Sequence, residues 1–310
     1  MRIGCPREIK DQEYRVGLTP ESAHELVRHG HEVWIETGAG RGIGANDAEY
    51  RQAGAAIVDG PEPIFAECEM VVKVKEPQAG ERERLREGQI LYTYLHLAPD
   101  PVQTADLVKS GVTAIAYETV TGPGGRLPLL TPMSQVAGRM SIQAGATALE
   151  KGHGGRGVLL GGVPGVMPGK VAVVGGGVVG FNAAQMAVGL GAQVSILDRD
   201  PAVLEKVGTF FENRAATRFS NAANLHAAVC EADLVIGAVL IPGAAAPKLV
   251  TREMLGDMKP GAVLVDVAID QGGCFETSRP TTHSEPTFVV DDVVHYCVAN
   301  LSLIHISEPT

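Results

Sequence analysis

Cysteine is scarce and scattered in this chain of 310 residues. The five cysteines are odd in number, and no two of them form a Cys-x-x-Cys pair. Disulfide frameworks and structural zinc sites both need several cysteines at short, defined spacings. The sequence therefore argues against a disulfide framework and against a zinc site, and we expect no bound metal. It indicates a reducing compartment, and we expect a cytoplasmic protein.

Runs of basic residues are also absent. The chain has 26 basic and 36 acidic residues, a net charge of −10, and a pI of about 5.4. The densest basic groups are short, and both lie next to glutamates: Lys73 with Lys75, and Arg82 with Arg84 and Arg86. Because nucleic-acid binders usually carry a basic stripe, we expect no nucleic-acid partner.

No apolar leader is visible in the first eight residues, MRIGCPRE, so we expect no signal peptide. One uncharged stretch, residues 171–197, is long enough to span a bilayer. It contains six glycines and four polar side chains, which favour a strand, a glycine turn and a buried helix over a transmembrane helix. We therefore expect no membrane association.

Glycine, by contrast, is abundant. The chain has 38 glycines in 310 residues, whereas the usual share is about 7%. They follow no collagen-like period, so they indicate tight turns and close approaches of the backbone. The length suggests two domains of roughly 150 residues each.

Short apolar stretches alternate with helical segments over the first 130 residues. A cap followed by proline marks two helix starts, at Thr19-Pro20 and at Asp100-Pro101. Such alternation is typical of βαβ units and a parallel sheet. We predict a first domain over residues 1–133, with strands at 2–5, 31–36, 70–74, 90–94 and 113–118.

A helix rich in small residues is predicted over residues 134–152, with Gly152 as its C-cap. It lies between two βα arrays, so we interpret it as a connector that packs closely on another helix. The second domain then covers residues 134–300. Within it, the glycine-rich segment 161–169 contains two prolines and is predicted to be a loop or a hairpin.

A dinucleotide-binding motif follows a short apolar strand at 170–174. Gly175, Gly177 and Gly180 occupy the three glycine positions of G-x-G-x-x-G. They allow a tight turn, space for a pyrophosphate against bare backbone, and close helix–strand packing. The helix that comes next would direct its N-terminal amides toward the pyrophosphate. The motif predicts a Rossmann domain.

Asp198 follows the next predicted strand, where a carboxylate can accept the hydroxyls of a ribose. A carboxylate there would repel a 2′-phosphate, which favours NAD over NADP, although the adjacent Arg199 leaves NADP open. Val239 and Leu240 end another strand, and Asp270 lies just past the strand at 262–267. Ligands bind beyond the carboxyl ends of strands in open α/β sheets. Asp270 therefore faces the ligand site or caps its own loop.

Lys75 and His96 are the first domain's candidates for chemistry. Each follows an apolar strand, so both are expected to project toward a cleft between the domains. A surface lysine and a hydrogen-bonded loop histidine are the simpler interpretations. Arg15, in a polar loop after the first strand, is a weaker candidate.

Several ordered motifs give the chain a resemblance to the alanine dehydrogenase family. They are GCPREIK at 4–10, YRVGLTP at 14–20, VKEP at 74–77, YLHLA at 94–98, PMS at 132–134, GGGVVG at 175–180 and DVAIDQGG at 266–273. The resemblance implies two Rossmann-like, doubly wound parallel-sheet domains flanking a cleft. It also implies reversible oxidative deamination of L-alanine to pyruvate and ammonium with NAD, and a homo-oligomer, usually a hexamer.

The resemblance assigns roles residue by residue. Arg15 and Lys75 would bind the substrate, and His96 and Asp270 would act as acid and base. Position 203, often basic in the family, is Val here, so one contact on the adenosine side is absent. The NAD site would be lined by Ser134, Gly175, Gly177, Val178, Val179, Gly180, Asp198, Ser220, Val239, Leu240, Val267, Ala268, Ile269, Asp270, Arg279, Val298 and Asn300.

Two other functions stay open at this point. The NAD-binding subunit of a proton-translocating transhydrogenase has the same two-domain layout, and a catalytically inactive NAD-binding regulator would keep only the cofactor site. The last ten residues, LSLIHISEPT, have no counterpart in the family pattern. We expect residues 301–310 to be a non-native tail on a chain that lacks the family's C-terminal helices.

Overall fold

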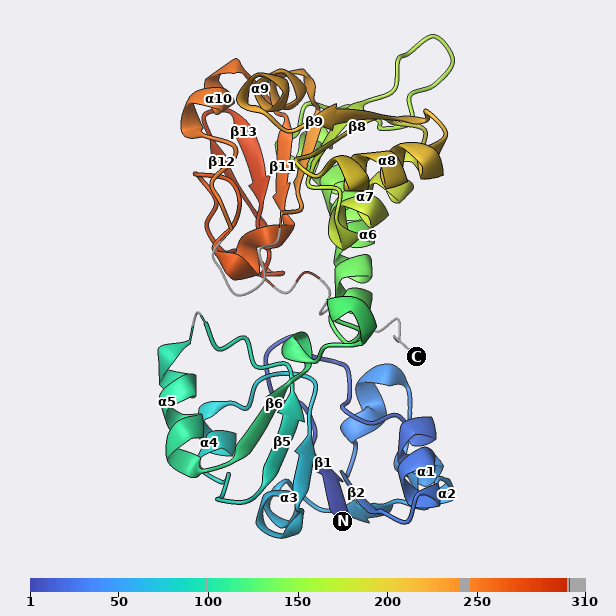
Figure 1. The fold of residues 1–310 in the computed structure, drawn as a ribbon, viewed down its shortest axis with the longest axis vertical. Helices are drawn as coiled ribbons and strands as arrows, with labels where there is room; N and C mark the ends of the chain where they lie inside the picture. The colour runs from blue at the N-terminus through green and yellow to red at the C-terminus, as the bar shows by residue number, and fades with distance from the viewer. Residues whose placement is uncertain (99, 240–245, 300, 302–310) are drawn as a thin grey trace. The chain divides into compact units, whose positions relative to one another are not determined.

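The computed structural model describes residues 1–98, 100–239, 246–299 and 301. It divides into two compact units, one over Met1–Pro132 and one that begins at Met133. Each unit is built around one sheet with helices packed on it (Figure 1).

The first unit contains a six-stranded parallel sheet in the order β3-β2-β1-β4-β5-β6. This is the strand order of a doubly wound dinucleotide-type fold. The strands are β1 (Arg2–Cys5), β2 (Glu32–Glu36), β3 (Ala56–Val58), β4 (Met70–Val72), β5 (Ile90–Thr93) and β6 (Thr113–Ala116). The helices are α1 (Pro20–Arg28), α2 (Asp47–Gln52), α3 (Glu62–Glu67), α4 (Ala79–Arg82) and α5 (Pro101–Ser110).

Both predicted helix starts in this unit are confirmed. The side chain of Thr19 accepts a hydrogen bond from the backbone N–H of Ser22, and Asp100 accepts one from Gln103. Three strand predictions run past the observed ends. The strands expected over 70–74 and 90–94 stop at Val72 and Thr93. The strand expected over 113–118 stops at Ala116, and a 3₁₀ turn, Tyr117–Thr119, follows it. The turn places Glu118 beside the end of β5 rather than in the sheet.

The second unit contains a seven-stranded sheet in the order β12-β13-β11-β10-β7-β8-β9. Six strands are parallel, and β12 pairs antiparallel with β13 at one edge. The strands are β7 (Lys170–Val174), β8 (Gln193–Asp198), β9 (Ala215–Phe219), β10 (Leu234–Gly237), β11 (Val263–Asp266), β12 (Thr287–Val290) and β13 (Val293–Tyr296). The α/β fold class is confirmed.

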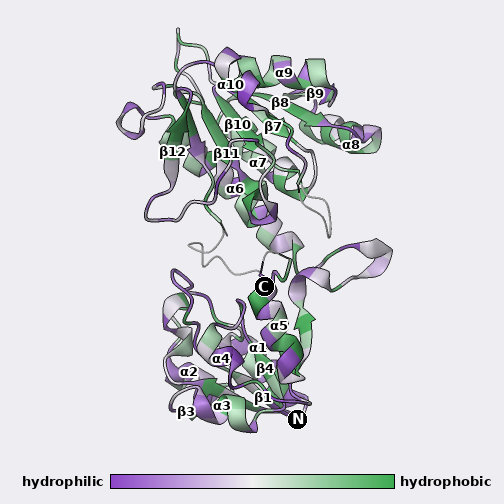
Figure 2. Ribbon diagram, turned by 90° about the vertical axis from the view of Figure 1, so that its left-hand side faces the viewer, coloured by the Kyte–Doolittle hydropathy of each residue, from purple (hydrophilic) through white to green (hydrophobic). Residues whose placement is uncertain are grey.

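Helices α7 (Val178–Gly189), α8 (Pro201–Phe211), α9 (Ala222–Glu231) and α10 (Arg252–Asp257) complete this unit. The strands β7, β10 and β11 are almost entirely apolar (Figure 2). Apolar clusters pack on both faces of the sheet, so these strands are buried on both sides, as parallel strands usually are.

The predicted helix at 134–152 is present but shifted. Helix α6 runs from Thr131 to Ala148, and Gly152 lies in a 3₁₀ turn rather than at the C-cap. The predicted close packing is confirmed. A Cβ added to Gly138 would lie 2.3 Å from the carbonyl oxygen of Val179 on α7, so only glycine allows this approach. The segment 161–169 contains a bridge between Val163 and Val166, as expected for a hairpin.

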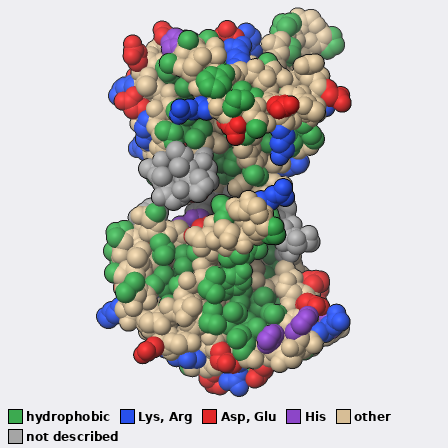
Figure 3. All heavy atoms as spheres, in the orientation of Figure 1, with side chains coloured by type: hydrophobic (Ala, Val, Ile, Leu, Met, Phe, Trp, Pro, Cys, Tyr) green, Lys and Arg blue, Asp and Glu red, His purple; other side chains and the backbone are tan. Residues whose placement is uncertain are grey.

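No helix among the described residues is both long enough and apolar enough to cross a membrane. The five cysteines form no disulfide with one another. On the face shown in Figure 3, acidic and basic side chains are interspersed. That view shows no stripe of one charge.

Candidate active site

The first unit brings Lys75 and His96 together. Lys75 follows β4 and His96 follows β5, and these strands are parallel neighbours. The Nζ of Lys75 lies 3.1 Å from the Nε2 of His96. Because a lysine ammonium only donates, the Nε2 of a neutral His96 accepts and its Nδ1 carries the proton. The two residues expected at strand ends are therefore hydrogen-bonded neighbours.

Tyr94 packs against both of these residues. Its ring is stacked on the His96 imidazole at 6.0 Å between centroids, and the Nζ of Lys75 lies 5.7 Å from the ring centroid. The Tyr94 hydroxyl donates to the carbonyl of Leu129. Burial raises the pKa of Tyr94 to about 12, so the ring stays neutral at physiological pH. Tyr94 forms a fixed wall of the site.

The imidazole of His96 is neutral at neutral pH. Burial, followed by the positive charge of Lys75, lowers the pKa of His96 to about 4. The carboxylate of Glu118 acts in the opposite direction, and the charges of Lys10 and Arg15 add to the lowering. A neutral imidazole can take up a proton from a reacting group, which is the requirement for a general base.

Arg15 belongs to the same neighbourhood, since its charge acts on both His96 and Tyr94. Its guanidinium is held by Glu13 in a two-point ion pair. Nε and NH2 of Arg15 donate to the two Glu13 carboxylate oxygens at 2.8 and 2.7 Å. Such fork geometry orients an arginine firmly. The sequence analysis did not identify Glu13, although it lies only two residues before Arg15.

A buried ion cluster supports the end of β4. The Nζ of Lys73 donates to Glu8 at 3.0 Å and to Glu81 at 2.8 Å, and all three side chains are almost completely buried. The other oxygen of Glu8 accepts the backbone N–H of Val74 at 2.6 Å. The cluster therefore anchors the backbone that leads into Lys75.

The second unit contains the glycine cradle at the end of β7. Gly175 has a φ of +101°, a conformation that favours glycine. A Cβ on Gly180 would lie 1.8 Å from the carbonyl oxygen of Gly175, whereas a Cβ on Gly177 would meet nothing within 4 Å. Gly177 is the N-cap residue of α7, and no side chain caps the helix there. These residues fit a dinucleotide pyrophosphate, which needs open backbone amides at a helix start.

Asp198 lies where the motif predicts an acid, at the end of β8. Its Oδ2 accepts the N–H of Gly176 at 2.7 Å, and its Oδ1 accepts the N–H of Asp200 at 2.9 Å. The backbone N–H of Ser220, after β9, donates to the Asp198 carbonyl at 2.8 Å. Gly176, Asp198 and Ser220 are therefore adjacent at the carboxyl-terminal ends of β7, β8 and β9.

Other predicted cofactor residues also follow the carboxyl-terminal ends of strands. Val239 follows β10 and contacts the Gly175 turn, and residues 267–270 form a 3₁₀ helix after β11. Val298 is buried in an apolar cluster with Met140 and Leu301. The guanidinium of Arg279 lies over the Phe288 ring at 4.4 Å. Ser134 lies in the first turn of α6.

Leu240 and Asn300 lie outside the described residues. Of the expected tail, residues 302–310 also lie outside them.

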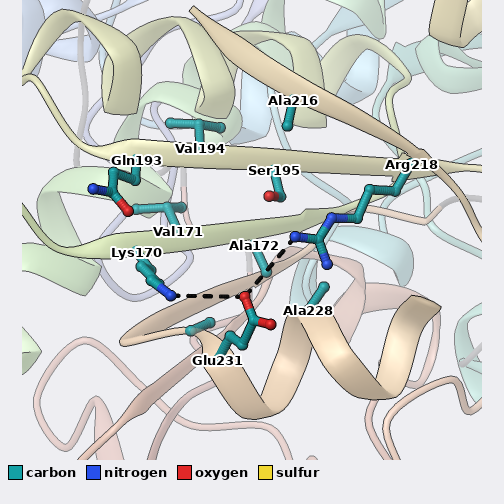
Figure 4. Close-up of a pocket in the computed structure, with 11 residues that line it drawn as sticks. Lys170, Val171, Ala172, Gln193, Val194, Ser195, Ala216, Arg218, Ala228 and Glu231 are labelled. Carbon is teal, nitrogen blue, oxygen red and sulfur yellow. Dashed lines mark ion pairs between the residues drawn. The ribbon is translucent and has the colours of Figure 1, made fainter. Parts of the chain in front are cut away.

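One pocket lies away from these carboxyl-terminal strand ends. It covers the amino-terminal halves of β7 and β8 beside α9, where Glu231 forms ion pairs with Lys170 at 3.7 Å and Arg218 at 3.9 Å (Figure 4). Ligands of open α/β sheets bind at the opposite, carboxyl-terminal ends of the strands. We therefore do not assign this pocket to the cofactor.

One group of side chains elsewhere in this unit has metal-ligand chemistry. His226 and Cys230 lie one turn apart on α9, and with Asp257 of α10 they place one ligand atom each within 4.8 Å of one another. His226 and Asp257 are exposed and form an ion pair at 3.0 Å. That ion pair by itself accounts for the arrangement.

The fold and the two groups of residues define a class of protein. A glycine cradle with its acid, and a lysine–histidine pair at the strand ends of a second doubly wound sheet, are features of nicotinamide-dependent dehydrogenases. Two family models match the chain: "Alanine dehydrogenase/PNT, N-terminal domain" over residues 4–137 and "Alanine dehydrogenase/PNT, C-terminal domain" over residues 141–305. The chain belongs to the alanine dehydrogenase family, whose members use NAD.

Similar proteins agree with this assignment. The chain is 60% identical to the alanine dehydrogenase of Halomonas elongata and 56% identical to that of Mycolicibacterium smegmatis. Each match covers 97% of this chain and 81% of the relative. A solved L-alanine dehydrogenase superposes with a TM-score of 0.93 at 55% identity, covering 98% of this chain and 84% of that one.

A transhydrogenase from Sinorhizobium meliloti is structurally similar but more distant in sequence. Its TM-score is 0.83 at 29% identity, and the match covers 98% of this chain and 88% of that one. The chain is therefore an NAD-dependent amino-acid dehydrogenase by its relatives, rather than a transhydrogenase subunit.

Proposed function

We propose that this chain catalyses the reversible oxidative deamination of L-alanine to pyruvate and ammonium with NAD. The observation that carries the proposal is the contact of 3.1 Å between Lys75 Nζ and His96 Nε2, beside the oriented guanidinium of Arg15. The three side chains provide a fixed cation for a carboxylate, a donor for a carbonyl oxygen, and a neutral base.

Each of these residues has a defined task in the proposal. Arg15 binds the carboxylate of alanine, since a guanidinium fork matches a carboxylate. Lys75 donates to the oxygen that develops negative charge as the carbonyl forms. His96 accepts a proton from the water that attacks the imine carbon, and it returns a proton when ammonium leaves. Asp270 is the second acid/base group.

The second unit would hold the cofactor. NAD supplies the hydride acceptor when it is bound. The open amides at Gly177 and the start of α7 bind the pyrophosphate, and Asp198 binds the ribose hydroxyls. Ser134, Ser220, Val239, the 267–270 turn and Arg279 line the remainder. In this proposal residues 1–133 form the substrate domain and residues 134–300 the NAD domain.

Two broader features belong to the same proposal. The family resemblance supports a homo-oligomer, with a hexamer as the expected state. The five unpaired cysteines are compatible with the cytoplasm, since thiols persist in a reducing compartment.

The experiment is an assay of NADH formation from L-alanine and NAD by the purified chain and two variants. We expect the wild-type chain to form NADH. His96→Ala should retain NADH affinity and lose turnover by a factor of about 100 or more. The matched control is His29→Ala, which removes an exposed histidine of the same unit and should leave turnover unchanged.

Two outcomes would contradict the proposal. Wild-type turnover in His96→Ala would remove this histidine from the chemistry. A chain that binds NADH but forms none from L-alanine would instead be an NAD-binding subunit or an inactive regulator.

A further inference from the structure

The carboxylate of Glu118 contacts the backbone of the His96 segment. Glu118 lies in the 3₁₀ turn after β6, and its carboxylate reaches the end of the neighbouring strand β5. Its Oε1 accepts the N–H of His96 at 2.7 Å and that of Leu95 at 3.2 Å. Two successive backbone amides thus converge on one carboxylate, the arrangement of an anion-binding nest.

The backbone of His96 needs such support. Its φ is +49°, in the left-handed region that residues with a Cβ rarely adopt. This conformation turns the chain out of β5 and directs the imidazole toward Lys75. Because both amides of the turn donate to Glu118, the carboxylate stabilises this conformation over the extended alternative.

The turn that carries Glu118 is itself held in place by aromatic packing. The ring of Tyr117 meets Tyr92 edge-on at 4.3 Å and Tyr94 edge-on at 4.9 Å between centroids. Tyr92 and Tyr94 flank the end of β5, so the two strand ends are fixed against each other. The Glu118 carboxylate is therefore presented by a rigid support rather than by a loose loop.

We propose that Glu118 is a positioning residue that holds His96 in the left-handed conformation required for its contact with Lys75. It also adds a negative charge beside the imidazole, which opposes the effects of burial and of Lys75 on the His96 pKa. The proposal rests on the catalytic role of His96 given above. It adds that the end of β6, which carries Glu118, determines the reactivity of the site together with the ends of β4 and β5, which carry Lys75 and His96.

Two variants separate the geometry from the charge. Glu118→Gln keeps an oxygen acceptor for the amides but loses the charge, and Glu118→Ala loses both. We expect kcat to fall about 100-fold in Glu118→Ala and less in Glu118→Gln, because misplacing a catalytic group by about 1 Å costs about that factor. In Glu118→Gln, the acid limb of the kcat/KM profile should move to lower pH. The variant lacks the negative charge that favours protonation of His96, so the pKa of His96 falls.

Glu83→Gln is the matched control. It makes the same chemical change at an exposed position of the same unit, and it should leave kcat and the profile unchanged. NADH affinity and the thermal midpoint are measured for every variant, so that a variant that fails to fold is recognised. If Glu118→Ala does not fold, Glu118→Gln decides the question through the pH profile.

A second readout does not depend on turnover. ¹⁵N-histidine NMR at pH 7 reports the ring tautomer of His96, assigned through the signal that His96→Gln lacks. We expect the Nδ1–H tautomer in the wild-type chain and its loss or mixing in Glu118→Ala. An unchanged tautomer together with wild-type kcat in Glu118→Ala would overturn the proposal. If the chain forms no NADH at all, the proposed function fails, and the tautomer still decides the role of Glu118.

Discussion

The carboxylate of Asp198 accepts a hydrogen bond of 2.7 Å from the backbone N–H of Gly176. The acid at the end of β8 is thereby tied to the glycine turn at the end of β7. The carboxylate that is proposed to bind the ribose also orients the loop that is proposed to bind the pyrophosphate. One residue thus connects the two halves of the proposed cofactor site.

Replacing Asp198 should weaken NAD binding and reduce discrimination against NADP. In Asp198→Asn we expect the KM for NAD to rise about 10-fold or more, because hydrogen bonds to charged groups contribute about 1.5–3 kcal/mol. The ratio of kcat/KM for NAD over NADP should fall, since the charge that repels a 2′-phosphate is gone. Asp200→Asn is the control, because asparagine also caps α8 and removes the same charge. An unchanged ratio in Asp198→Asn would contradict the assignment.

Two glycines of the cradle should respond differently to alanine. In Gly180→Ala the new Cβ would lie 1.8 Å from the Gly175 carbonyl oxygen, so we expect a lower thermal midpoint and a damaged cradle. In Gly177→Ala the Cβ meets nothing within 4 Å, so the midpoint should change by less than about 2 °C. We nevertheless expect Gly177→Ala to weaken NADH binding, because its methyl group occupies the proposed pyrophosphate space. Calorimetry and NADH titration measure both effects, and full NADH affinity in Gly177→Ala would place the pyrophosphate elsewhere.

The His96 pKa predicts how stability depends on pH. It is about 4 in the folded chain, against about 6.5 in an unfolded chain. Between these values the unfolded state binds the extra proton, so this residue makes stability fall as pH drops from about 6.5 toward 4. In His96→Gln, this contribution to the fall in the free energy of unfolding should disappear. Urea unfolding at pH 7.5 and pH 5 tests this, with the exposed His153→Gln as the control. Equal losses in His96→Gln and wild type would show that the folded pKa is not lowered.

The buried Lys73 should be required for stability because it pairs with two carboxylates. Lys73→Met leaves Glu8 and Glu81 buried without their cation, and we expect a loss of about 3–5 kcal/mol in the free energy of unfolding. The triple variant that also carries Glu8→Gln and Glu81→Gln should recover part of this loss, because no buried charge is left unpaired. Lys109→Met, on the exposed side of α5, is the control and should change stability by less than about 0.5 kcal/mol. If Lys73→Met were as stable as the wild-type chain, the proposed role of the cluster would be contradicted.

Local sequence signals predicted much of the architecture. The proline-marked caps located two helix starts, and the apolar stretches located most central strands, because these signals depend on neighbouring residues. The short peripheral elements were not predicted. Strands β9 and β13 contain polar residues and pair with the apolar strands β8 and β11, and β12 pairs in turn with β13.

The sequence by itself determined the cofactor motif, since three glycines and an acid are needed at defined spacings along one βαβ unit. It also identified Lys75 and His96 as residues at strand ends. Only the tertiary structure decided which partners these residues have. Glu118 contacts the His96 backbone across 22 residues, and Glu8 contacts Val74 across 66, because parallel neighbours in a sheet are distant in sequence. No local pattern encodes such pairings, which arise only when the strands are in register.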